Sequence, residues 1–300
     1  MNMEVTKYCA NGNDFLLYNA FTHTRDFVSI TSKNFNTKSG ELNFSQIAKI
    51  LCARHSGLGA DGFVAVLPIN SGDLKDFASE ALLDSKKPAY KWDFYNADGS
   101  KAAMCGNASR CVGNFAYAQG IAELTHNFLS QAGIIGVSID SANPLLVESA
   151  LGKCKFLREV QEESIWGERW FLLDSGVPHL VCFCENPALL PLPAGENLTR
   201  LKQLREKYDA NINVACVQEK GKIAYATFER GVEDVTLACG SGAVAILAQS
   251  HKLGLSDNSA LLIPPSKESL EVRVDFELCG YLKGKVSHIS ECKVDSALFI

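Results

Sequence analysis

The sequence lacks the features that mark several broad classes of protein. Acidic residues (34) outnumber basic residues (29), so the formal net charge is −5 and the basic patch that binds nucleic acid is not expected. No apolar run approaches the roughly 18 residues needed to cross a bilayer. Residues 1–5 lack the charged and apolar regions of a signal peptide. We therefore expect a cytoplasmic protein that binds neither nucleic acid nor membranes.

The chain also lacks paired cysteine motifs, although it contains 11 cysteines. Their odd number, their scatter along the chain and the absence of a C-x-x-C pair argue against a disulfide framework or a zinc ribbon. The glycine-rich stretch 53–63 is not followed by the Lys-Ser/Thr pair of a phosphate-binding loop. We expect no metal and no nucleotide, and we expect most cysteines to be buried free thiols.

Two of the cysteines stand at the predicted beginnings of helices. Cys105 follows the turn-forming run 96–101 and precedes a predicted helix over 107–117. Cys239 likewise precedes a small, glycine-bearing run and the apolar residues 244–248. A thiol at a helix N-terminus faces unpaired N–H groups and the positive end of the helix dipole, which favours the thiolate and lowers the thiol pKa. The pattern therefore predicts two activated thiols.

The surroundings of the two cysteines are similar. A predicted strand over 91–95 leads into a polar loop before Cys105, and a predicted strand over 222–228 leads into a polar loop before Cys239. Strand, loop, cysteine and helix thus occur twice in the same order. We infer an α/β protein with two similar halves that each present one thiol to a shared cleft. The expected domains are residues 1–130 and residues 131–286.

Two similar thiols suit a reaction that is itself nearly symmetric. A redox pair usually places its thiols close in sequence, and a cysteine hydrolase does not need a second thiol. Inversion of a stereocentre needs one group to remove a proton and another to return one to the opposite face. Two helix N-termini can also hold a carboxylate through backbone N–H groups, and these groups belong to Gly106, Asn107, Gly240 and Ser241. No sequence sign of a carbanion-stabilising cofactor such as pyridoxal phosphate is present, so we expect no cofactor.

Further motifs occur in a characteristic order along nearly the whole chain. They are Gly12-Asn13-Asp14-Phe15, Gly59-Ala60-Asp61-Gly62, Asn96-Ala97-Asp98-Gly99-Ser100, Met104-Cys105-Gly106-Asn107, Pro178-His179, Asn211 with Asn213, Glu229-Arg230-Gly231 and Ala238-Cys239-Gly240-Ser241-Gly242-Ala243. In these motifs the sequence resembles the diaminopimelate epimerases, which belong to the cofactor-independent amino-acid racemases.

The resemblance implies both a fold and an activity. The fold would be two pseudo-symmetric α/β halves, each a curled sheet around a central helix, with the active site in the cleft between them and a terminal strand, 287–300, returning to the first half. The activity would be the interconversion of LL- and meso-diaminopimelate, for lysine and peptidoglycan precursors, by a homodimer. Cys105 and Cys239 would exchange the roles of thiolate base and thiol acid. The implied substrate-binding residues are Asn13, Asn96, Asn211 and Arg230 at the distal end of the substrate, and His179 and Glu229 beside the reacting centre.

The chain departs from the common form of the family at several positions. Val177 stands where many members have Asn, Ala108 where Gly is usual and Cys9 where many have His, and the loop 229–239 is one residue longer, with Val235 before Thr236. A racemase of another amino acid with the same thiol pair, such as a proline-racemase-like enzyme, is the near alternative. Arg230 and three asparagines favour a substrate with a second charged amino-acid end. A thiol redox sensor or metal-binding regulator is the alternative from another class.

Overall fold

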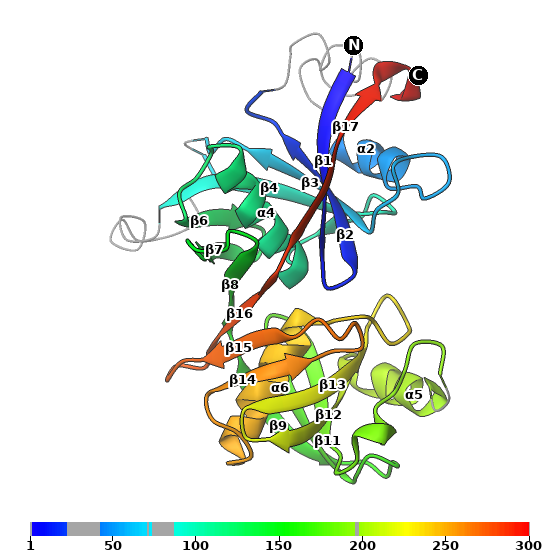
Figure 1. The fold of residues 1–300 in the computed structure, drawn as a ribbon. Coiled ribbons are helices and arrows are strands. Elements are labelled where there is room, and N and C mark those ends of the chain that lie inside the picture. The colour runs from blue at the N-terminus through cyan, green and yellow to red at the C-terminus, as the bar shows by residue number, and fades with distance from the viewer. Residues whose placement is uncertain (1, 23–42, 71, 74–86, 196–197, 300) are drawn as a thin grey trace. The chain divides into compact units, whose positions relative to one another are not determined.

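The computed structural model describes residues 2–22, 43–70, 72–73, 87–195 and 198–299. It divides into two compact units: unit 1 comprises residues 1–147 and 286–300, and unit 2 comprises residues 148–285 (Figure 1). We expected the first division after residue 130. It falls after residue 147 because β6 (Thr125–Ser130) pairs with β4 (Pro88–Asn96) and with β7 (Gly133–Ile139), so these strands all belong to the first sheet.

Unit 1 is built on a mixed sheet. Its strands, in spatial order, are β17 (Ser287–Asp295), β1 (Asn2–Ala10), β2 (Asn13–Asn19), β3 (Gly62–Leu67), β4, β6 and β7, with the short β5 (Lys101–Ala102) also on β4. β1 and β2 form the hairpin expected from the polar turn between them. The end of the chain lies beside its beginning because β17 pairs with β1. Residues 298–299, expected as strand, instead lie in the 3₁₀ helix η2 (Ser296–Phe299), and residue 300 lies outside the described residues.

Unit 2 is built on a second mixed sheet. Its strands, in spatial order, are β9 (Lys155–Gln161), β10 (Arg169–Asp174), β11 (Pro178–Phe183), β12 (Asn211–Glu219), β13 (Lys222–Phe228), β14 (Ser259–Ile263), β15 (Leu270–Val274) and β16 (Cys279–Lys285). β8 (Leu146–Lys153) begins with the last two residues of unit 1 and pairs with β16.

The two sheets repeat one order of pairings. A hairpin comes first, β1 with β2 and β10 with β11. A helix then leads to a parallel strand, β3 after α2 (Phe44–Leu51) and β12 after α5 (Leu198–Tyr208). An antiparallel strand follows, β4 or β13, then α4 (Gly106–Ala118) or α6 (Gly240–Lys252), and then a second parallel strand, β6 or β14. The predicted fold class of two similar α/β halves is therefore confirmed.

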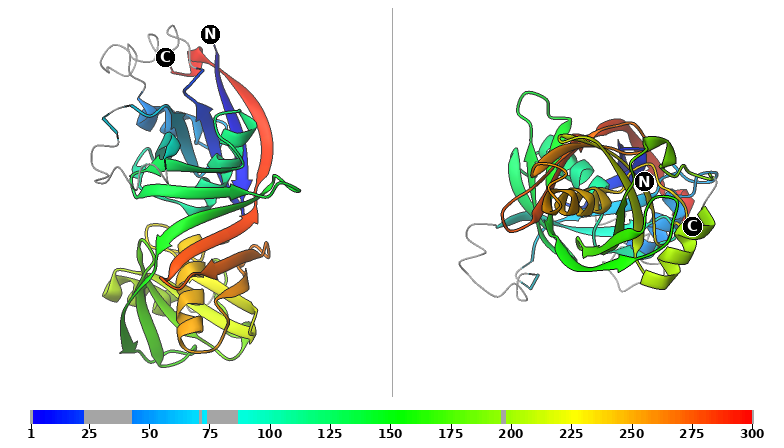
Figure 2. Two further views of the ribbon diagram at one scale, coloured as in Figure 1. Left: turned by 90° about the vertical axis from the view of Figure 1, so that its left-hand side faces the viewer. Right: turned by 90° about the horizontal axis from the view of Figure 1, so that it is seen from below.

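The sheet of each unit curls around a central helix (Figures 1 and 2). Residues 107–116 of α4 are all buried, as are residues 242–250 of α6, which is the pattern of a helix enclosed by its own domain. Close contact with the sheet depends on glycine in both units. A Cβ at Gly113 would lie 2.6 Å from Cγ1 of Val137, and one at Gly280 would lie 2.3 Å from Cγ1 of Val244.

A second apolar layer covers the outer face of each sheet. In unit 1, α2 packs Ile47 and Leu51 against a core that includes Phe63. In unit 2, α5 packs Leu201 and Leu204 against a core that includes Trp170. The 3₁₀ helix η1 (Pro187–Leu189) lies beside β12. Each sheet thus has apolar side chains on both faces, which explains why its strands read as nearly continuous hydrophobic runs.

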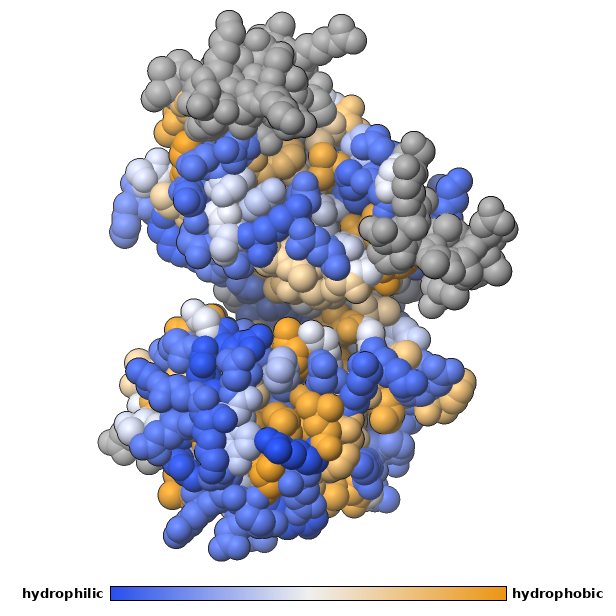
Figure 3. Space-filling model, turned by 180° about the vertical axis from the view of Figure 1, so that it is seen from behind, coloured by the Kyte–Doolittle hydropathy of each residue, from blue (hydrophilic) through white to orange (hydrophobic). Residues whose placement is uncertain are grey.

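The surface mixes polar and apolar side chains. Hydrophobic residues on the visible face of each unit are interrupted by hydrophilic ones (Figure 3). The most exposed large apolar side chain among the described residues is Phe276, which is 94% exposed. No helix in the described part of the chain is both long enough and apolar enough to span a membrane.

Candidate active site

Both predicted thiols lie at helix N-termini. Cys105 is the N-cap residue of α4 with extended backbone (φ −151°, ψ 124°), and Cys239 is the N-cap residue of α6 (φ −117°, ψ 112°). Neither cysteine side chain caps its helix, and neither helix has an acidic residue in its first turn. Because the first N–H groups of a helix have no partner within it, each thiol lies beside donors that favour an anion.

In unit 1, the Asn13 side chain faces Cys105. The Cys105 Sγ lies 3.8 Å from Oδ1 of Asn13, to which the thiol donates. The Asn13 Nδ2 donates to Oδ2 of Asp61 at 2.5 Å. Since a carboxylate only accepts hydrogen bonds, Asp61 fixes the orientation of the Asn13 amide and turns its oxygen toward the sulfur.

Asp61 belongs to a charged cluster that joins two of the sequence motifs. Arg54 Nη2 contacts Asp61 Oδ1 at 2.6 Å and Asp14 Oδ1 at 3.0 Å, and Lys7 Nζ contacts Asp14 Oδ2 at 3.0 Å. The backbone N–H groups of residues 14 and 61 also donate to each other's carboxylates. Burial opposes ionisation of Asp14, but the Arg54 and Lys7 hydrogen bonds outweigh it and lower the pKa of this carboxyl. The cluster therefore holds the segment 12–15, which contains Asn13, against the segment 59–62.

Replacing Asp61 with asparagine is expected to lower kcat/KM about tenfold. The substitution removes a charge-assisted partner of the Asn13 amide, worth about 1.5 kcal/mol, and frees the amide to rotate. Kinetics of the reaction that the sequence resemblance implies would measure the effect. Asp73→Asn is the matched control, because it breaks the Lys91–Asp73 ion pair (2.8 Å) of the same unit. An Asp61→Asn protein as active as the control would contradict this positioning role.

The other predicted residues of unit 1 occupy two places. Asn96 is exposed at the end of β4, where its Nδ2 donates to Ser100 Oγ at 3.0 Å. Gly106 and Asn107 form the first turn of α4. The Asn107 Oδ1 accepts a hydrogen bond from Nη2 of Arg110 at 2.7 Å. Arg110 is fully buried and also donates to Asn11. It was assigned no role from the sequence, because an arginine in a helix is usually exposed to solvent.

In unit 2, Cys239 lies between a carboxyl group and a hydroxyl group. Its Sγ is 3.6 Å from Oγ of Ser241, and its thiol donates to the Glu229 carboxylate. Thr236 Oγ1 also donates to Glu229 Oε1, at 2.5 Å. Burial raises the pKa of Glu229, and the hydrogen bonds from Thr236 and Cys239 only partly offset it. Glu229, Gly240 and Ser241, which the sequence predicts as substrate-binding residues, thus lie beside this thiol.

His179 is a fully buried member of the same group. Its Nε2 lies 3.0 Å from Ser241 Oγ, and its Nδ1 lies 3.0 Å from Nδ2 of Asn213. Burial, together with the positive charge of Arg230, lowers its pKa to about 4. The imidazole is consequently neutral at neutral pH, and it touches the predicted site through Ser241.

The buried imidazole predicts a pH-dependent stability. The pKa of His179 is about 4 in the folded chain and about 6.5 when unfolded, so below pH 6.5 the unfolded chain binds the proton more tightly. The free energy of unfolding should therefore rise between about pH 4 and 6.5, by roughly 3 kcal/mol from this group, and gain nothing more above that range. Urea unfolding of the wild type and of His179→Gln across this range measures the difference. Equal pH slopes in the two proteins would refute the assignment.

Asn211 and Arg230 lie together at the edge of the same group. Asn211 Nδ2 donates to the Pro178 carbonyl at 3.2 Å, and its Oδ1 accepts from the Arg230 backbone N–H at 2.9 Å. The Arg230 side chain is about one-third exposed, and its Nη1 contacts Asp209 Oδ2 at 3.0 Å. Both hydrogen bonds of the guanidinium to Asp209 come from Nη1. The Nη2 and Nε donors of Arg230 are not used in these two bonds.

Strand register explains why residues distant in sequence meet in unit 2. His179 of β11 is aligned with Asn211 of β12, and Asn213 of β12 is aligned with Thr227 of β13. Asn213 and Thr227 were not among the predicted site residues, although they are almost completely buried. The sequence did contain a signal for Asn213. Side chains alternate between the two faces of a strand, so Asn213 must point to the same face as the predicted residue Asn211.

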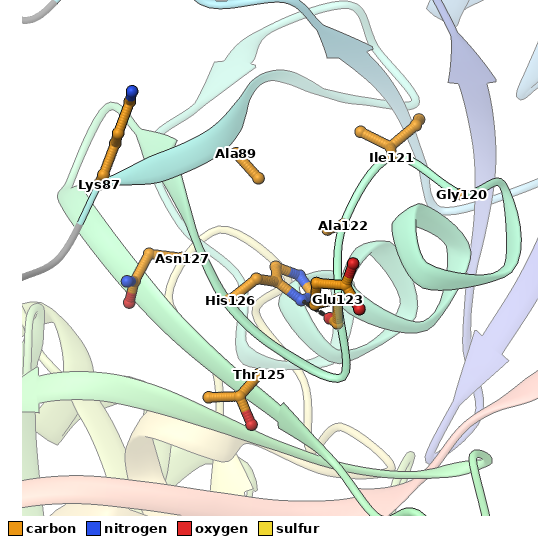
Figure 4. Close-up of a pocket in the computed structure, with 9 residues that line it drawn as sticks. All are labelled: Lys87, Ala89, Gly120, Ile121, Ala122, Glu123, Thr125, His126 and Asn127. Carbon is orange, nitrogen blue, oxygen red and sulfur yellow. Dashed lines mark hydrogen bonds between the residues drawn. The ribbon is translucent and has the colours of Figure 1, made fainter.

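A pocket in unit 1 lies away from the predicted residues. It has a volume of about 390 Å³ and is lined by residues that include Lys87, Glu123 and His126 (Figure 4). His126 is held on both ring nitrogens, by the Glu123 carbonyl at 2.6 Å and by the Tyr90 hydroxyl at 3.3 Å, which marks it as structural. In the described ranges, no group of three or more His, Cys, Asp or Glu side chains is placed to hold a metal ion.

Known proteins resemble the chain in sequence and in fold. A model of the family "Diaminopimelate epimerase" matches residues 5–157 and 171–289. A diaminopimelate epimerase of Nitratiruptor sp. is 37% identical over 289 residues, covering 96% of this chain and 97% of that protein. One of Helicobacter pylori is 40% identical over 294 residues, covering 94% and 93%.

Solved structures share the fold at much lower identity. A hydroxyproline epimerase of Agrobacterium vitis has a TM-score of 0.65 at 13% identity, covering 98% of this chain and 92% of that one. A PhzF-family phenazine biosynthesis protein of Bacillus anthracis has a TM-score of 0.66 at 14% identity, covering 98% and 99%. At this low identity the structural similarity supports the fold alone. The sequence matches are much stronger and extend over nearly the whole chain. The chain belongs to the diaminopimelate epimerase family.

Proposed function

We propose that this member of the family interconverts LL- and meso-diaminopimelate, with Cys105 and Cys239 as the two groups that move the Cα proton. The chain is thus an isomerase of the racemase and epimerase type. The observation that carries the residue roles is the equivalent position of the two cysteines. Each is the N-cap residue of the buried central helix of its unit, where the helix terminus favours a thiolate.

The proposed reaction needs one thiolate and one thiol at a time. The thiolate removes the proton from Cα, the electron pair of the C–H bond moves toward the adjacent carboxylate, and the second thiol delivers a proton to the opposite face. The sulfur that began as thiolate ends as thiol, so the reverse reaction uses the opposite roles. Protons and charge balance without an added redox partner.

Backbone donors would stabilise the charge that moves onto the carboxylate. The first-turn N–H groups of Gly106, Asn107, Gly240 and Ser241 are proposed to bind it, because oriented donors act on developing charge without reorganising. Glu229 is proposed to pair with the ammonium group beside the reacting carbon, and His179 to support Ser241.

The distal end of the substrate would be held by the second group of predicted residues. Arg230 presents a guanidinium to a carboxylate, and Asn13, Asn96 and Asn211 supply amide donors and acceptors. The proposal also includes a homodimer in the cytoplasm, in line with the family resemblance, and sedimentation of the purified protein would test the dimer.

Solvent deuterium exchange tests the proposed function. Purified, reduced protein without added cofactor is incubated with LL-diaminopimelate in D₂O, and Cα is followed by NMR. Deuterium at Cα together with the meso isomer is the expected result. Exchange of proline or glutamate without any exchange of diaminopimelate would favour another racemase. No exchange of any amino acid by fully reduced protein would contradict proton-transfer chemistry.

A further inference from the structure

A buried chain of hydrogen bonds in unit 2 ends at the sulfur of Cys239. It runs from Thr227 through Asn213 and His179 to Ser241, and each link is a recorded contact of 2.9 to 3.0 Å. The final contact, from Ser241 Oγ to Cys239 Sγ, is 3.6 Å, an ordinary distance for sulfur. Thr227, Asn213 and His179 are each no more than 1% exposed, so water does not compete for these bonds.

The direction of every bond in this hydrogen-bond chain follows from the orientation of the Asn213 amide. Asn213 Nδ2 lies 3.1 Å from the Leu180 carbonyl and 3.2 Å from the Asn211 carbonyl. Carbonyl oxygens only accept, so this end of the amide must be the nitrogen. Thr227 Oγ1 donates to the other end, Oδ1, at 2.9 Å. The orientation of the Asn213 amide is thereby fixed.

The fixed amide determines the tautomer of His179. An amide nitrogen cannot accept a hydrogen bond, so the 3.0 Å contact between Asn213 Nδ2 and Nδ1 of the imidazole requires Nδ1 to be unprotonated. The proton of the neutral ring then lies on Nε2. Nε2 then donates to Ser241 Oγ. The Ser241 hydroxyl has one hydrogen, and its remaining recorded side-chain partner is Cys239 Sγ. The hydrogen of Ser241 therefore points to the sulfur.

The first turn of α6 packs closely against these hydrogen-bonded side chains. A Cβ at Gly242 would lie 2.5 Å from Asn213 Oδ1, 3.0 Å from Thr227 Oγ1 and 3.3 Å from Cys239 Sγ. Only glycine allows the helix terminus to approach these polar groups so closely. In unit 1 the side chain at the corresponding position is Asn107, two residues after Cys105, and it accepts from Arg110.

We propose that Asn213 and Thr227 are positioning residues that fix the His179 tautomer, so that the Ser241 hydroxyl donates a hydrogen bond to Cys239 and stabilises its thiolate. The inference rests on the proposed role of Cys239. It adds a function for the Ser241 side chain, besides its backbone N–H, and for two side chains that need not touch the substrate. A hydrogen bond to a charged sulfur is stronger than one to a neutral thiol, so the chain favours the ionised form.

The test titrates Cys239 by the ultraviolet absorbance of its thiolate. Each spectrum is corrected with the same protein carrying Cys239→Ala, which removes the signal of the other thiols. Ser241→Ala should raise the midpoint of the titration by about one pH unit, a tenfold loss of thiolate. Ser175→Ala is the matched control, because Ser175 Oγ donates to the Ser241 carbonyl at 2.9 Å and not to the sulfur. Glu229, Tyr225 and Arg230 are titratable groups around Cys239 and His179, and they stay unchanged in every variant.

Asn213→Asp tests the direction of the hydrogen bonds that lead to Cys239. An aspartate cannot donate, so Nδ1 must carry the proton, and Ser241 then donates to Nε2 instead of to the sulfur. The ¹⁵N shifts of ¹⁵N-histidine-labelled protein, with the His179 signals assigned by their loss in His179→Gln, should change from the Nε2–H to the Nδ1–H tautomer. The thiolate midpoint should rise as in Ser241→Ala, with no further rise in the double variant. If Asn213→Asp does not fold, Thr227→Val should raise the midpoint in the same direction by a smaller amount.

Two results would overturn the inference. One is a wild-type protein with its proton on Nδ1 of His179, and the other is a Ser241→Ala midpoint equal to that of Ser175→Ala. Neither readout uses substrate, so a failure here is distinct from a failure of the deuterium-exchange experiment.

Discussion

Cys105→Ala and Cys239→Ala are each expected to lower the rate of epimerisation by about 10²- to 10⁴-fold, the usual contribution of a positioned acid or base. Each substitution removes one of the two proton carriers and leaves the other in place. Because Cys105 and Cys239 occupy equivalent helix N-termini, the two losses should be similar in size. Appearance of the meso isomer from LL-diaminopimelate measures them.

Deuterium exchange should separate the two thiols further. A variant with one remaining thiol can remove the Cα proton from one isomer and return deuterium to the same face. Each variant should therefore exchange one isomer without inverting it, and the two variants should exchange opposite isomers. Cys111→Ala is the control, since Cys111 is a fully buried cysteine of the same helix as Cys105. Rapid inversion by either single-thiol variant would contradict the two-base mechanism.

Arg230→Ala is expected to raise KM for diaminopimelate about tenfold to hundredfold while changing kcat much less. The proposed role of the guanidinium is to bind the distal carboxylate, and charge-assisted hydrogen bonds of this type contribute about 1.5 to 3 kcal/mol. Such binding is common to the ground state and the transition state, so its loss should appear in KM. Arg230→Lys should recover only part of the affinity, because an ammonium group lacks the planar fork.

Asp209→Asn is the matched control for Arg230. Asp209 pairs with Nη1 of the guanidinium, but its backbone carbonyl, 3.2 Å from the same nitrogen, remains in the variant. Asp209 is 73% exposed, so the lost ion pair is worth little. KM should stay within about twofold of the wild type, on the scale of such exposed pairs. An unchanged KM in Arg230→Ala would remove this residue from the substrate site.

Local sequence signals predicted the elements that carry the thiols. The change from turn residues to small residues marks both helix beginnings, and the structure places Cys105 and Cys239 at the N-cap positions. The hairpin of β1 and β2, the strand β4 before Cys105 and the strand β13 before Cys239 are also formed by contiguous residues with alternating or apolar patterns. Such features depend on residues within a few positions of one another.

Features that depend on strand pairing were harder to predict. The partner of Asn13 is Asp61, which reaches it because β2 and β3 are parallel neighbours, and nothing in the local sequence fixes that pairing. The position of Thr227 beside Asn213 depends on the register of the β12–β13 hairpin, which includes a shift between Val217 and Glu219. The boundary at residue 130 was misplaced for a related reason, since β6 resembles a strand of either sheet until its pairing with β4 is known.

The return of β17 to β1 also affects the order in which the chain can fold during synthesis. Unit 2 consists of the continuous segment 148–285, whereas unit 1 needs residues 286–300 to cover the open edge of β1. All of unit 2 is therefore synthesised before the last strand of unit 1. Domains made on the ribosome usually fold from the N-terminus onward, but here the unit that is translated second can be the first to complete its sheet. Until then the edge of β1 is available to other strands, which makes the nascent chain vulnerable to mispairing until β17 has been synthesised.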